Sequence, residues 1–416
     1  MLIEFRVTNY RSFRDEQIFS FMASPSTELI DTNTFQCDAA GGRLLTSSVV
    51  YGANGAGKSN LIKAIAVMRE MVLVSAKEQL LFGGHDVDLD PYRLDINSLK
   101  EPISFEATFI LNGIRHQYGF TATRERVFEE WLHAYPKNHP QKLFERTPKD
   151  DDSSSWSFGT HMKGDKALLA NATRRNALYL SVGAALNHAT LTEIYNWFLH
   201  HLRPTGGGPG FWAGYSFTAR QSKTDPKFKL KVEQLLADAD FGISGLVIED
   251  ETIDVNERGT PRIEPWSTRL RIFTNHKMRN SDEITRFDLS NESSGTQRFF
   301  NLIGPVLEAL EDGRLIIIDE LDSSLHPLMV RKLVEVFNST TTNPKGAQIL
   351  FTTHDATLLD PELFRRDQIW FTEKDSLGQS HIYPLLEYSP RKGEALQKGY
   401  LAGRYGAIPI LGDFKF

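Results

Sequence analysis

The first 60 residues alternate apolar and polar positions and then give way to a continuous apolar run. The alternation is clear in IEFRVTNYRSF and QIFSF, and the run is LLTSSVVYG. Alternation is typical of strands with one solvated face, whereas a continuous run is typical of a strand buried on both faces. Next comes LIKAIAVMREMVLVSA, which places Leu61, Ile65, Met68 and Val72 on one helical face. The pattern predicts a small antiparallel section leading into a buried strand and then a helix.

Strand patterns return in the segment from 90 to 135, and a helical region follows. The strand segments are ISFEATFILNG, IRHQYGFTAT and RVFEEWLHAY, and the NGI sequence between the first two suits a tight hairpin turn. Residues 147–165 are polar and turn-rich, which predicts a surface loop. Residues 166–240 are mostly helical by period, and the Gly-rich piece at 204–210 predicts a flexible break within them.

The C-terminal half alternates strands and helices in short order. Strand patterns recur from 243 to 288, and a long helix is expected from about Ser293. Five segments follow, expected as strand, helix, strand, helix and strand: RLIIIDE, LMVRKLVEVFNST, AQILFTTH, ATLLDPELF and QIWFTEK. This order predicts a parallel sheet covered by helices.

The composition is that of an ordinary globular protein with one cysteine. The 416 residues are 40% hydrophobic and 24% charged, with a formal net charge of −6, which gives no support to general nucleic-acid affinity. The lone Cys37 excludes a disulfide within the chain and a Cys-rich zinc site, and we interpret it as a small buried apolar residue. There is no run of about 18 apolar residues and no leader pattern, so we expect a cytoplasmic protein without a membrane partner.

The segment Gly52–Ser59, GANGAGKS, fits G-x-x-x-x-G-K-[ST] between an apolar strand and an amphipathic helix. Glycines allow positive φ and bring backbone N–H groups to phosphate oxygens, and the following helix directs its positive end at the same phosphates. Lys58 would reach the β- and γ-phosphates and the Ser59 hydroxyl would hold Mg²⁺. The alternative is a chance match in a Gly-rich turn. The residues expected to contact the nucleotide are Asn54, Gly55, Ala56, Gly57, Lys58, Ser59 and Asn60.

Two later strands end in polar side chains. The first ends in Asp319 and Glu320, and Asp319 would lie at the carboxyl edge of a parallel sheet and hold Mg²⁺ through water. Glu320, expected to alternate to the other face, would accept a proton from the attacking water or orient that water. The alternative is a solvated acidic turn. His354 ends the next strand, where it would bond to the γ-phosphate and sense its presence.

The sequence LSNESSGTQRFF from Leu289 to Phe300 is a turn of small residues that opens a helix. Ser293, Ser294 and Gly295 suit the N-terminus of that helix, where hydroxyl and backbone donors hold an anion. N-capping by serine is expected there in any case. The open question is whether the same donors also meet a phosphate.

Together these four segments resemble the ATP-binding-cassette class of ATPases. GANGAGKS resembles its phosphate loop, ESSGT with Gln297 its signature, and TTHD its switch histidine, while IIIDE with the SSLH at 323–326 resembles its acidic strand and the loop after it. In that class the signature of one subunit covers the nucleotide held by the other. The resemblance therefore implies that ATP binds between two copies in a homodimer or higher homo-oligomer, and that the second copy contributes Ser293, Ser294 and Gly295.

The signature departs from the transporter consensus of that class. Ser294 stands where glycine is usual, and Thr296 stands where glutamine is usual. No glutamine loop is recognisable before residue 135, and the stretch from Asp90 to Leu94 lies nearest to where one is expected.

Over nearly its full length the chain is similar to a narrower bacterial group, the RloA/AbiL-type ATPases of abortive-infection loci. These are related to the ATPase of the PARIS system and to the head of OLD-type nucleases. The resemblance rests on IEFRVTNYRSFRDEQIFSF, ESSGTQRFFNL, DELDSSLHP and RKGEALQKGYLAGRYGAIP. It implies phage defence with an effector protein encoded nearby. An OLD-like nuclease and an SMC-like ATPase acting on DNA are the alternatives, which keep nucleic acid open as a partner.

The C-terminal segment carries a basic cluster. Its residues are Arg391, Lys392, Lys398 and Arg404, with Tyr400 and Tyr405 between them. The pattern fits contact with nucleic acid or an acidic partner, but we favour a solvated helix followed by a Gly-rich tail.

The predicted fold class is α/β: an ABC-type P-loop NTPase head with a mixed sheet, an antiparallel β subdomain plus a parallel core with helices, and a helical insertion. The predicted parts are 1–135 with the phosphate loop and β subdomain, 136–242 as the mostly helical insertion, 243–372 with the signature, acidic strand and histidine, and 373–416 as a C-terminal extension.

Overall fold

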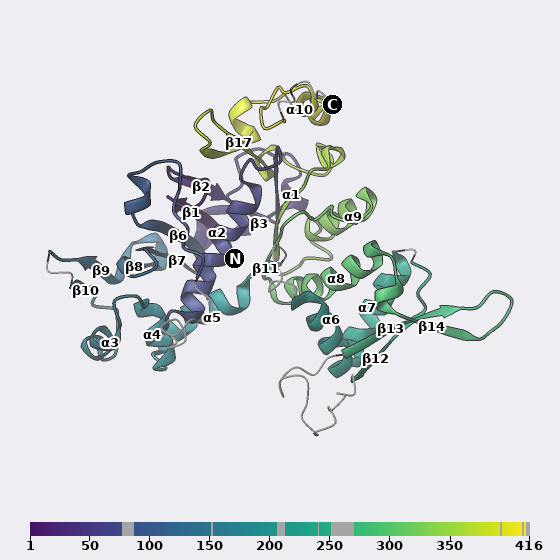
Figure 1. The fold of residues 1–416 in the computed structure, drawn as a ribbon, viewed down its shortest axis with the longest axis horizontal. Helices are drawn as coiled ribbons and strands as arrows, with labels where there is room; N and C mark the ends of the chain where they lie inside the picture. The colour runs from purple at the N-terminus through teal and green to yellow at the C-terminus, as the bar shows by residue number, and fades with distance from the viewer. Residues whose placement is uncertain are drawn as a thin grey trace. The chain divides into compact units, whose positions relative to one another are not determined.

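The chain divides into two compact units, each made from separate stretches of sequence (Figure 1). Unit 1 is Met1–Gly207, Ala309–Leu321 and Arg331–Phe416, and unit 2 is Gly208–Glu308 and Asp322–Val330. The structure, a computed structural model, describes residues 1–76, 87–150, 153–205, 213–239, 241–250, 270–391, 393–409 and 412.

An antiparallel sheet of seven strands forms one side of unit 1. Burial alternates along its strands, as the sequence pattern predicts for a sheet with one solvated face. Asn112 and Gly113 join two of the strands with φ of 52° and 71°, which confirms the predicted tight hairpin. In spatial order the strands are β10 (Ser154–Phe158), β9 (Gln141–Pro148), β8 (Val127–Tyr135), β7 (Ile114–Ala122), β6 (Ile103–Leu111), β1 (Leu2–Thr8) and β2 (Gln17–Ser20).

The second sheet of unit 1 is mostly parallel and carries the candidate site. β5, β15 and β16 are buried at every position, which is why their sequences read as continuous apolar runs. Among the strands described in this sheet, only β18 pairs antiparallel, at one edge. In spatial order the strands are β11 (Leu202–Thr205), β15 (Leu315–Ile318), β16 (Gln348–Thr352), β5 (Ser47–Gly52), β17 (Ile369–Lys374) and β18 (Ser380–Pro384).

Helix α2 (Lys58–Val74) lies in the core of unit 1. Its predicted apolar face is confirmed, because Leu61, Ile65, Met68 and Val72 are each at most 1% exposed. One hydrophobic cluster joins α2 to side chains of both sheets. Helices α4 (Tyr179–Ala185) and α5 (Ala189–His201) also contact α2.

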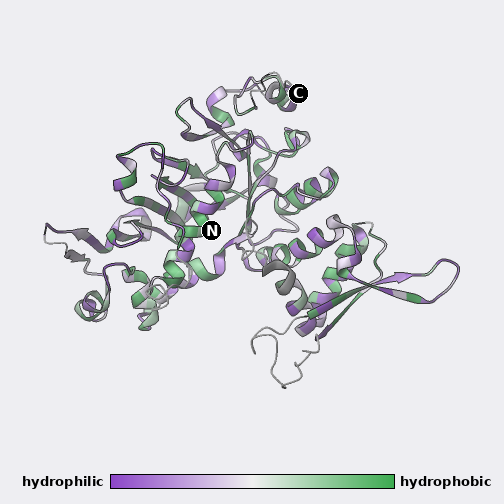
Figure 2. Ribbon diagram, in the orientation of Figure 1, coloured by the Kyte–Doolittle hydropathy of each residue, from purple (hydrophilic) through white to green (hydrophobic). Residues whose placement is uncertain are grey.

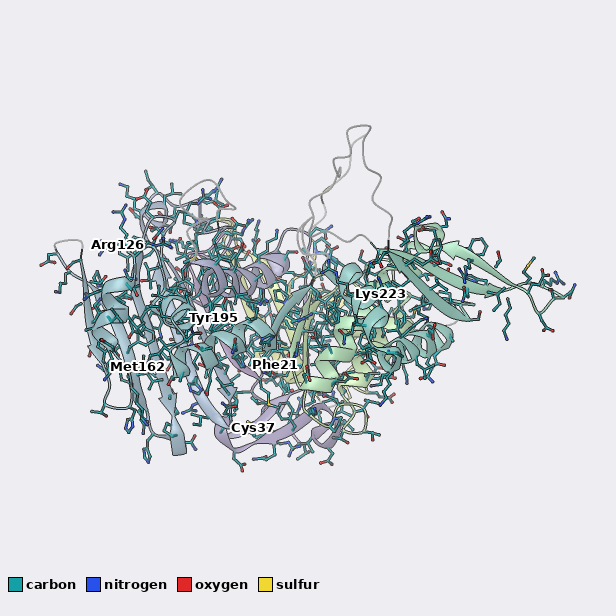
Figure 3. All side chains as sticks on the ribbon, turned by 90° about the horizontal axis from the view of Figure 1, so that it is seen from below. Phe21, Cys37, Arg126, Met162, Tyr195 and Lys223 are labelled. Carbon is teal, nitrogen blue, oxygen red and sulfur yellow. The ribbon has the colours of Figure 1, made fainter. Side chains whose placement is uncertain are left out.

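The remaining α-helices and strands of unit 1 are short. They are α1 (Ile30–Asn33), β3 (Thr34–Cys37), β4 (Gly42–Leu45), α3 (Lys166–Ala172) and α10 (Leu396–Leu401). Cys37 is half-buried at the end of β3, against the small apolar cluster of Ile3, Ala40 and Leu44 (Figure 3). The packing agrees with the apolar part of its interpretation, but Cys37 is only partly buried.

Unit 2 contains a three-stranded antiparallel sheet, two helices of its own and parts of two longer helices. Figure 2 shows both hydrophilic and hydrophobic residues along α9, as expected for a helix with one solvated face. The elements are α6 (Ala213–Thr224), α7 (Pro226–Asp238), β12 (Gly245–Asp250), β13 (Leu270–Lys277), β14 (Ile284–Asp288), α8 (Ser294–Asp312) and α9 (Pro327–Phe337). Helices α8 and α9 each continue into unit 1.

These sheets and helices confirm the predicted α/β fold with an antiparallel section beside a parallel core. Two local predictions are wrong. The sequence ATLLDPELF forms only a short 3₁₀ turn at Ala356–Leu358, because the Asp355 side chain caps that turn and Pro361 disfavours a helix through Asp360. Part of the predicted 147–165 loop is β10, a half-exposed edge strand that pairing with β9 stabilises.

The boundaries of the two units differ from the boundaries of the four predicted parts. Antiparallel strands continue past residue 135 to Phe158, and helices α3 to α5 of the predicted 136–242 insertion belong to unit 1. Across the described residues, no helix is long and apolar enough to cross a bilayer.

Candidate active site

The loop from β5 to α2 has the conformation that its glycines allow. Gly55 and Gly57 have φ of 75° and 121°, a region that side chains disfavour. A Cβ at Gly57 would also lie 2.7 Å from Ser380 Oγ, so glycine is needed there for space as well. Gly57 is the N-cap of α2 and no side chain caps the helix. The first-turn N–H groups are therefore arranged as in an anion-binding helix N-terminus.

Lys58 is held inside this loop rather than extended into solvent. Its side chain is 6% exposed, and Nζ donates to the carbonyl oxygens of Gly52 at 2.7 Å and Ala53 at 3.0 Å. A buried ammonium needs such partners because desolvation is costly. The positive charge is thus already positioned at the loop. Of the other predicted contact residues, Asn54 and Gly55 are exposed, Ala56 and Gly57 are buried, and Ser59 and Asn60 are half-buried.

Asp319 lies at the same sheet edge as the loop. β16 pairs in parallel with both β5 and β15, so the carboxyl ends of these three strands meet at one edge. Thr352 Oγ1 donates to Asp319 Oδ1 at 2.7 Å. The same hydroxyl accepts from the Glu320 N–H at 2.8 Å, and Thr352 O accepts from Leu321 N at 3.0 Å. Thr352 therefore fixes the turn that presents both carboxylates.

Glu320 does not reach its position by strand alternation, so that expectation is wrong. β15 ends at Ile318, and Glu320 takes a left-handed conformation with φ of 50° while its side chain is exposed. A non-glycine residue in this region is strained, and such strain is often found at functional sites. The turn after β15, rather than the alternation of side chains along the strand, therefore sets the orientation of the Glu320 carboxylate.

His354 follows β16 at the same edge, as predicted from its position after a strand neighbouring the acidic one. Its side chain is exposed. The turn that carries it is fixed by Tyr51 OH, which donates to Asp355 O at 3.2 Å, and by the Asp355 N–H, which donates to Thr353 Oγ1 at 3.0 Å. The phosphate loop, the two carboxylates and this histidine thus lie at the ends of three adjacent strands of unit 1.

The residues fit a magnesium site of the usual kind. Mg²⁺ is generally held by one or two protein oxygens together with water and phosphate oxygens. Ser59 in the first turn of α2 and the Thr352-held Asp319 supply one hydroxyl and one carboxylate. Within the described ranges, no group of three or more His, Cys, Asp or Glu side chains forms an all-protein metal site.

The serine turn at the start of α8 is a separate structure within unit 2. Ser293 Oγ accepts from the Thr296 N–H at 3.1 Å, which confirms the expected N-capping. The side chains of Ser293 and Ser294 are exposed. A Cβ at Gly295 would lie 2.8 Å from Ser324 O, so only glycine allows the loop after the acidic strand to pack there.

Glu292 anchors this turn to β13. Its carboxylate oxygen Oε1 accepts from Thr274 Oγ1 and lies 2.7 Å from His276 Nε2, while its side chain is only 14% exposed. Gln297 Nε2 donates to Glu292 O at 2.8 Å and Ser290 O at 3.2 Å. These bonds fix the backbone on both sides of Ser293.

Sequence reasoning missed the residues that hold the site in shape. We had assigned no role to Thr352, Glu292 or His276 from the motifs. Asn60 Nδ2 donates to Ser12 Oγ at 2.7 Å, although the two residues are 48 positions apart. The stretch from Asp90 to Leu94, which lies nearest to where a glutamine loop is expected, contains no glutamine, and the Asp90 carbonyl accepts from the Arg11 N–H at 2.8 Å.

The tyrosines of the C-terminal segment are core residues. Tyr400 and Tyr405 are 8% and 1% exposed and stack on Phe371 of β17 with ring centroids 5.6 and 6.0 Å apart. Burial, with a bond to Glu394, raises the pKa of Tyr405 to about 12. These rings are unavailable to bases, so tyrosine stacking on nucleic acid is excluded here. Lys398 and Arg391 are exposed, and Lys392 lies outside the described residues.

Comparison with known proteins gives one family. No curated protein sequence matches this chain significantly. Among solved structures, an SMC head bound to the C-winged helix domain of ScpA is similar, with 13% identity, a TM-score of 0.45, and coverage of 92% of this chain and 97% of that one. The SMC head domain from Thermotoga maritima has 16% identity, a TM-score of 0.40, and coverage of 92% and 98%.

A family model described as "AAA domain, putative AbiEii toxin, Type IV TA system" matches residues 47–360. That match begins in β5 just before the phosphate loop and ends just after His354, and it covers well over half of the chain. The chain therefore belongs to this AAA-domain family of P-loop ATPases.

Proposed function

We propose that this chain binds and hydrolyses ATP with Mg²⁺ at a composite site completed by a second copy, and that closure and opening of this dimer regulate a partner effector in an anti-phage defence system. The observation that carries the proposal is the alignment at one sheet edge of the phosphate loop with the Thr352-held Asp319. Phosphate binding alone would not need a fixed carboxylate there.

Each candidate site residue of unit 1 has a role in this proposal. The N–H groups around Gly57 and the Lys58 ammonium bind the phosphates, and Lys58 exchanges its carbonyl partners for phosphate oxygens. Ser59 and Asp319 hold Mg²⁺, which neutralises phosphate charge. Glu320 orients the attacking water and accepts its proton, and His354 bonds to the γ-phosphate.

The second copy supplies the serine turn. Ser293 and Ser294 are exposed donors beside the N-terminus of α8, a 19-residue helix with its positive end at the turn. The resemblance to ATP-binding-cassette ATPases supports placing them on the nucleotide of a sister molecule. Closure then depends on ATP, and hydrolysis through Glu320 reopens the dimer.

Two experiments test the two parts of the proposal. Sedimentation of the purified protein should show an ATP-dependent dimer that Glu320→Gln makes long-lived. Co-purification should show that the product of the adjacent open reading frame binds the wild type in at least one nucleotide state. If the protein stays monomeric under all conditions, the proposed ATP-sandwich dimer is wrong. If the product of the adjacent open reading frame binds in no nucleotide state, the proposed regulation of a partner effector is wrong.

The DNA-associated alternative has a different readout. If the chain acts on nucleic acid directly, it should bind duplex DNA in an ATP-dependent and salt-sensitive manner. Nuclease activity that survives Lys58→Ala would favour the OLD-like alternative.

A further inference from the structure

Four of the large apolar side chains in unit 1 form an exposed patch. Leu94, Ile96, Leu99 and Leu377 are 70%, 72%, 51% and 76% exposed, and we call them the apolar patch. Three of them are the most exposed large hydrophobic side chains in the part of the chain that the structure describes. Three of the four lie within the six residues 94–99, and several exposed large apolar side chains in one segment often mark an interaction site.

Hydrogen bonds hold the patch in shape. Tyr92 OH donates to Leu377 O at 3.0 Å, and a Cβ at Gly378 would lie 2.6 Å from a Leu94 methyl, so the two segments pack together. Asn9 Nδ2 donates to Ser98 O at 2.8 Å, and Arg14 pairs with Asp95 at 2.8 Å. The apolar groups are therefore presented by a fixed loop, which reduces the entropy cost of binding a partner.

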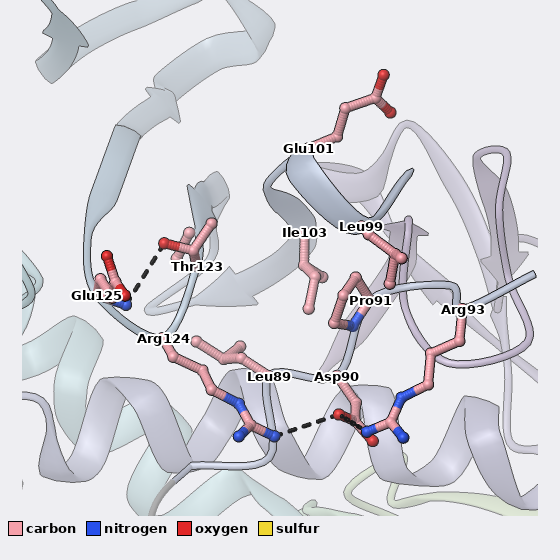
Figure 4. A pocket seen from close by; sticks show the side chains of 11 residues that line it. Leu89, Asp90, Pro91, Arg93, Leu99, Glu101, Ile103, Thr123, Arg124 and Glu125 are labelled. Carbon is pink, nitrogen blue, oxygen red and sulfur yellow. Dashed lines mark hydrogen bonds and ion pairs between the residues drawn. The ribbon is translucent and has the colours of Figure 1, made fainter. Parts of the chain in front are cut away.

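A hollow of about 730 Å³ adjoins the patch and shares Leu99 with it (Figure 4). Its apolar lining consists of Leu89, Pro91, Leu99, Ile103 and Ala122.

Two arginines mark the polar end of the hollow. Arg93 and Arg124 both donate to the same oxygen of Asp90, at 2.6 and 3.2 Å, and their side chains are 68% and 57% exposed. Figure 4 shows them on either side of Asp90, whereas Glu101 points away from the hollow. Glu125 also lines the hollow, beside Thr123, whose Oγ1 accepts from the Glu125 N–H. Each guanidinium carries five N–H groups, so the pair retains donors for a second carboxylate.

We propose that the apolar patch and this hollow form the docking surface for a partner protein, through a segment that carries apolar side chains next to Asp or Glu. The apolar side chains cover Leu94, Ile96 and Leu99, and the carboxylate binds Arg93 and Arg124. This deepens the partner role proposed above, because it names a surface and the chemistry that fits it.

Hydrogen bonds within unit 1 connect this surface to the phosphate loop. A second hollow of about 300 Å³ shares Asp90, Pro91 and Arg93 with the first and reaches Ser12 and Asn60. The Arg11 N–H donates to Asp90 O, and the neighbouring Ser12 accepts from Asn60 in the first turn of α2. A partner that shifts Asp90 would thus move Arg11 and Ser12, and through them the first turn of α2, which follows the phosphate loop.

The test uses a probe that does not depend on any known partner. A displayed library of random 12-residue peptides is selected against the full-length wild type and counter-selected against Leu94→Glu/Ile96→Glu. Selected peptides should combine apolar residues with Asp or Glu. Fluorescence anisotropy should show dissociation constants weakened about tenfold or more by the double variant and by Arg124→Glu, as for loss of an interface anchor. Leu168→Glu, at another exposed leucine (60%), is the matched control and should bind as the wild type does.

Three outcomes would overturn the proposal. Selected peptides could bind the double variant as tightly as the wild type, or they could be rich in Lys and Arg and insensitive to Arg124→Glu. Alternatively, sedimentation could show that the wild type self-associates through the patch and the double variant does not, which would make a second copy the occupant. Because no neighbouring gene product is used, these outcomes are separate from failure of the proposed effector role.

Discussion

The phosphate loop of unit 1 and the serine turn of unit 2 hold their polar groups in opposite ways. Lys58 is 6% exposed and bonded to its own loop, whereas Ser293 and Ser294 face solvent on a turn that Glu292 anchors. Hydrogen bonds within the chain hold both in place, but only the first is enclosed. Under the proposed function, one copy would therefore suffice to bind nucleotide, and the serine turn would contact nucleotide only after a second copy assembles. Variants in the two regions should therefore fail at different steps.

The largest effect is expected from Lys58→Ala. Loss of the buried ammonium removes a preorganised charge from the phosphates, and we expect kcat/KM for ATP to fall about 10³-fold. Titration with a fluorescent ATP analogue should show weakened binding by the monomer. Lys63→Ala, on the same helix, is the control and should behave as the wild type. Retention of normal binding by Lys58→Ala would contradict the phosphate assignment.

Glu320→Gln should separate binding from hydrolysis. The amide keeps the shape of the left-handed turn but cannot accept a proton, so we expect kcat to fall about 10²-fold, in the range for loss of a general base. ATP should remain bound and the dimer should accumulate in sedimentation. Glu362→Gln, at an exposed carboxylate, is the control. A normal rate of phosphate release from Glu320→Gln would show that another group is the base.

Ser293→Arg should affect assembly and spare nucleotide binding. The long cation obstructs the sister nucleotide site at a cost of about 2 kcal/mol, which corresponds to about 30-fold weaker ATP-driven dimerisation. It is measured by sedimentation in the Glu320→Gln background, and the ATP affinity of the monomer should not change. Ser281→Arg, in the turn between β13 and β14, is the control within unit 2. Equal dimerisation of both variants would show that the serine turn is not at the interface.

Glu292→Gln should give the smallest effect. It weakens the bonds from Thr274 and His276 but leaves the backbone bonds of Gln297, so we expect a loss of about 1 kcal/mol, or about fivefold, in dimerisation. Glu283→Gln, on the exposed turn, is the control. A variant that loses ATP binding instead would show that the anchor acts on the phosphate loop and not on the serine turn.

The sequence predicted the elements that carry local signals. The phosphate loop has a fixed spacing, and β5, β15 and β16 have unbroken apolar runs that require burial on both faces. From those strands the common edge holding Asp319 and His354 could be deduced, and β16 between β5 and β15 confirms it.

The supporting contacts could not be predicted because they join distant positions. Thr352 reaches Asp319 across 33 positions, and Asn60 reaches Ser12 across 48. Threonine, serine and asparagine are common, so no spacing marks these pairs. The predicted orientation of the Glu320 side chain was wrong for a related reason. The hydrogen bond from the Glu320 N–H to Thr352 turns the chain after Ile318, and a strand pattern does not reveal that bond.

A structure of the Glu320→Gln protein loaded with ATP and Mg²⁺ tests the central claim most directly. The account predicts two copies in which Ser293 and Gly295 of one lie within hydrogen-bonding distance of the γ-phosphate held by Lys58 of the other. Serine turns that face solvent in the nucleotide-loaded state, with each γ-phosphate contacted by a single copy, would contradict it.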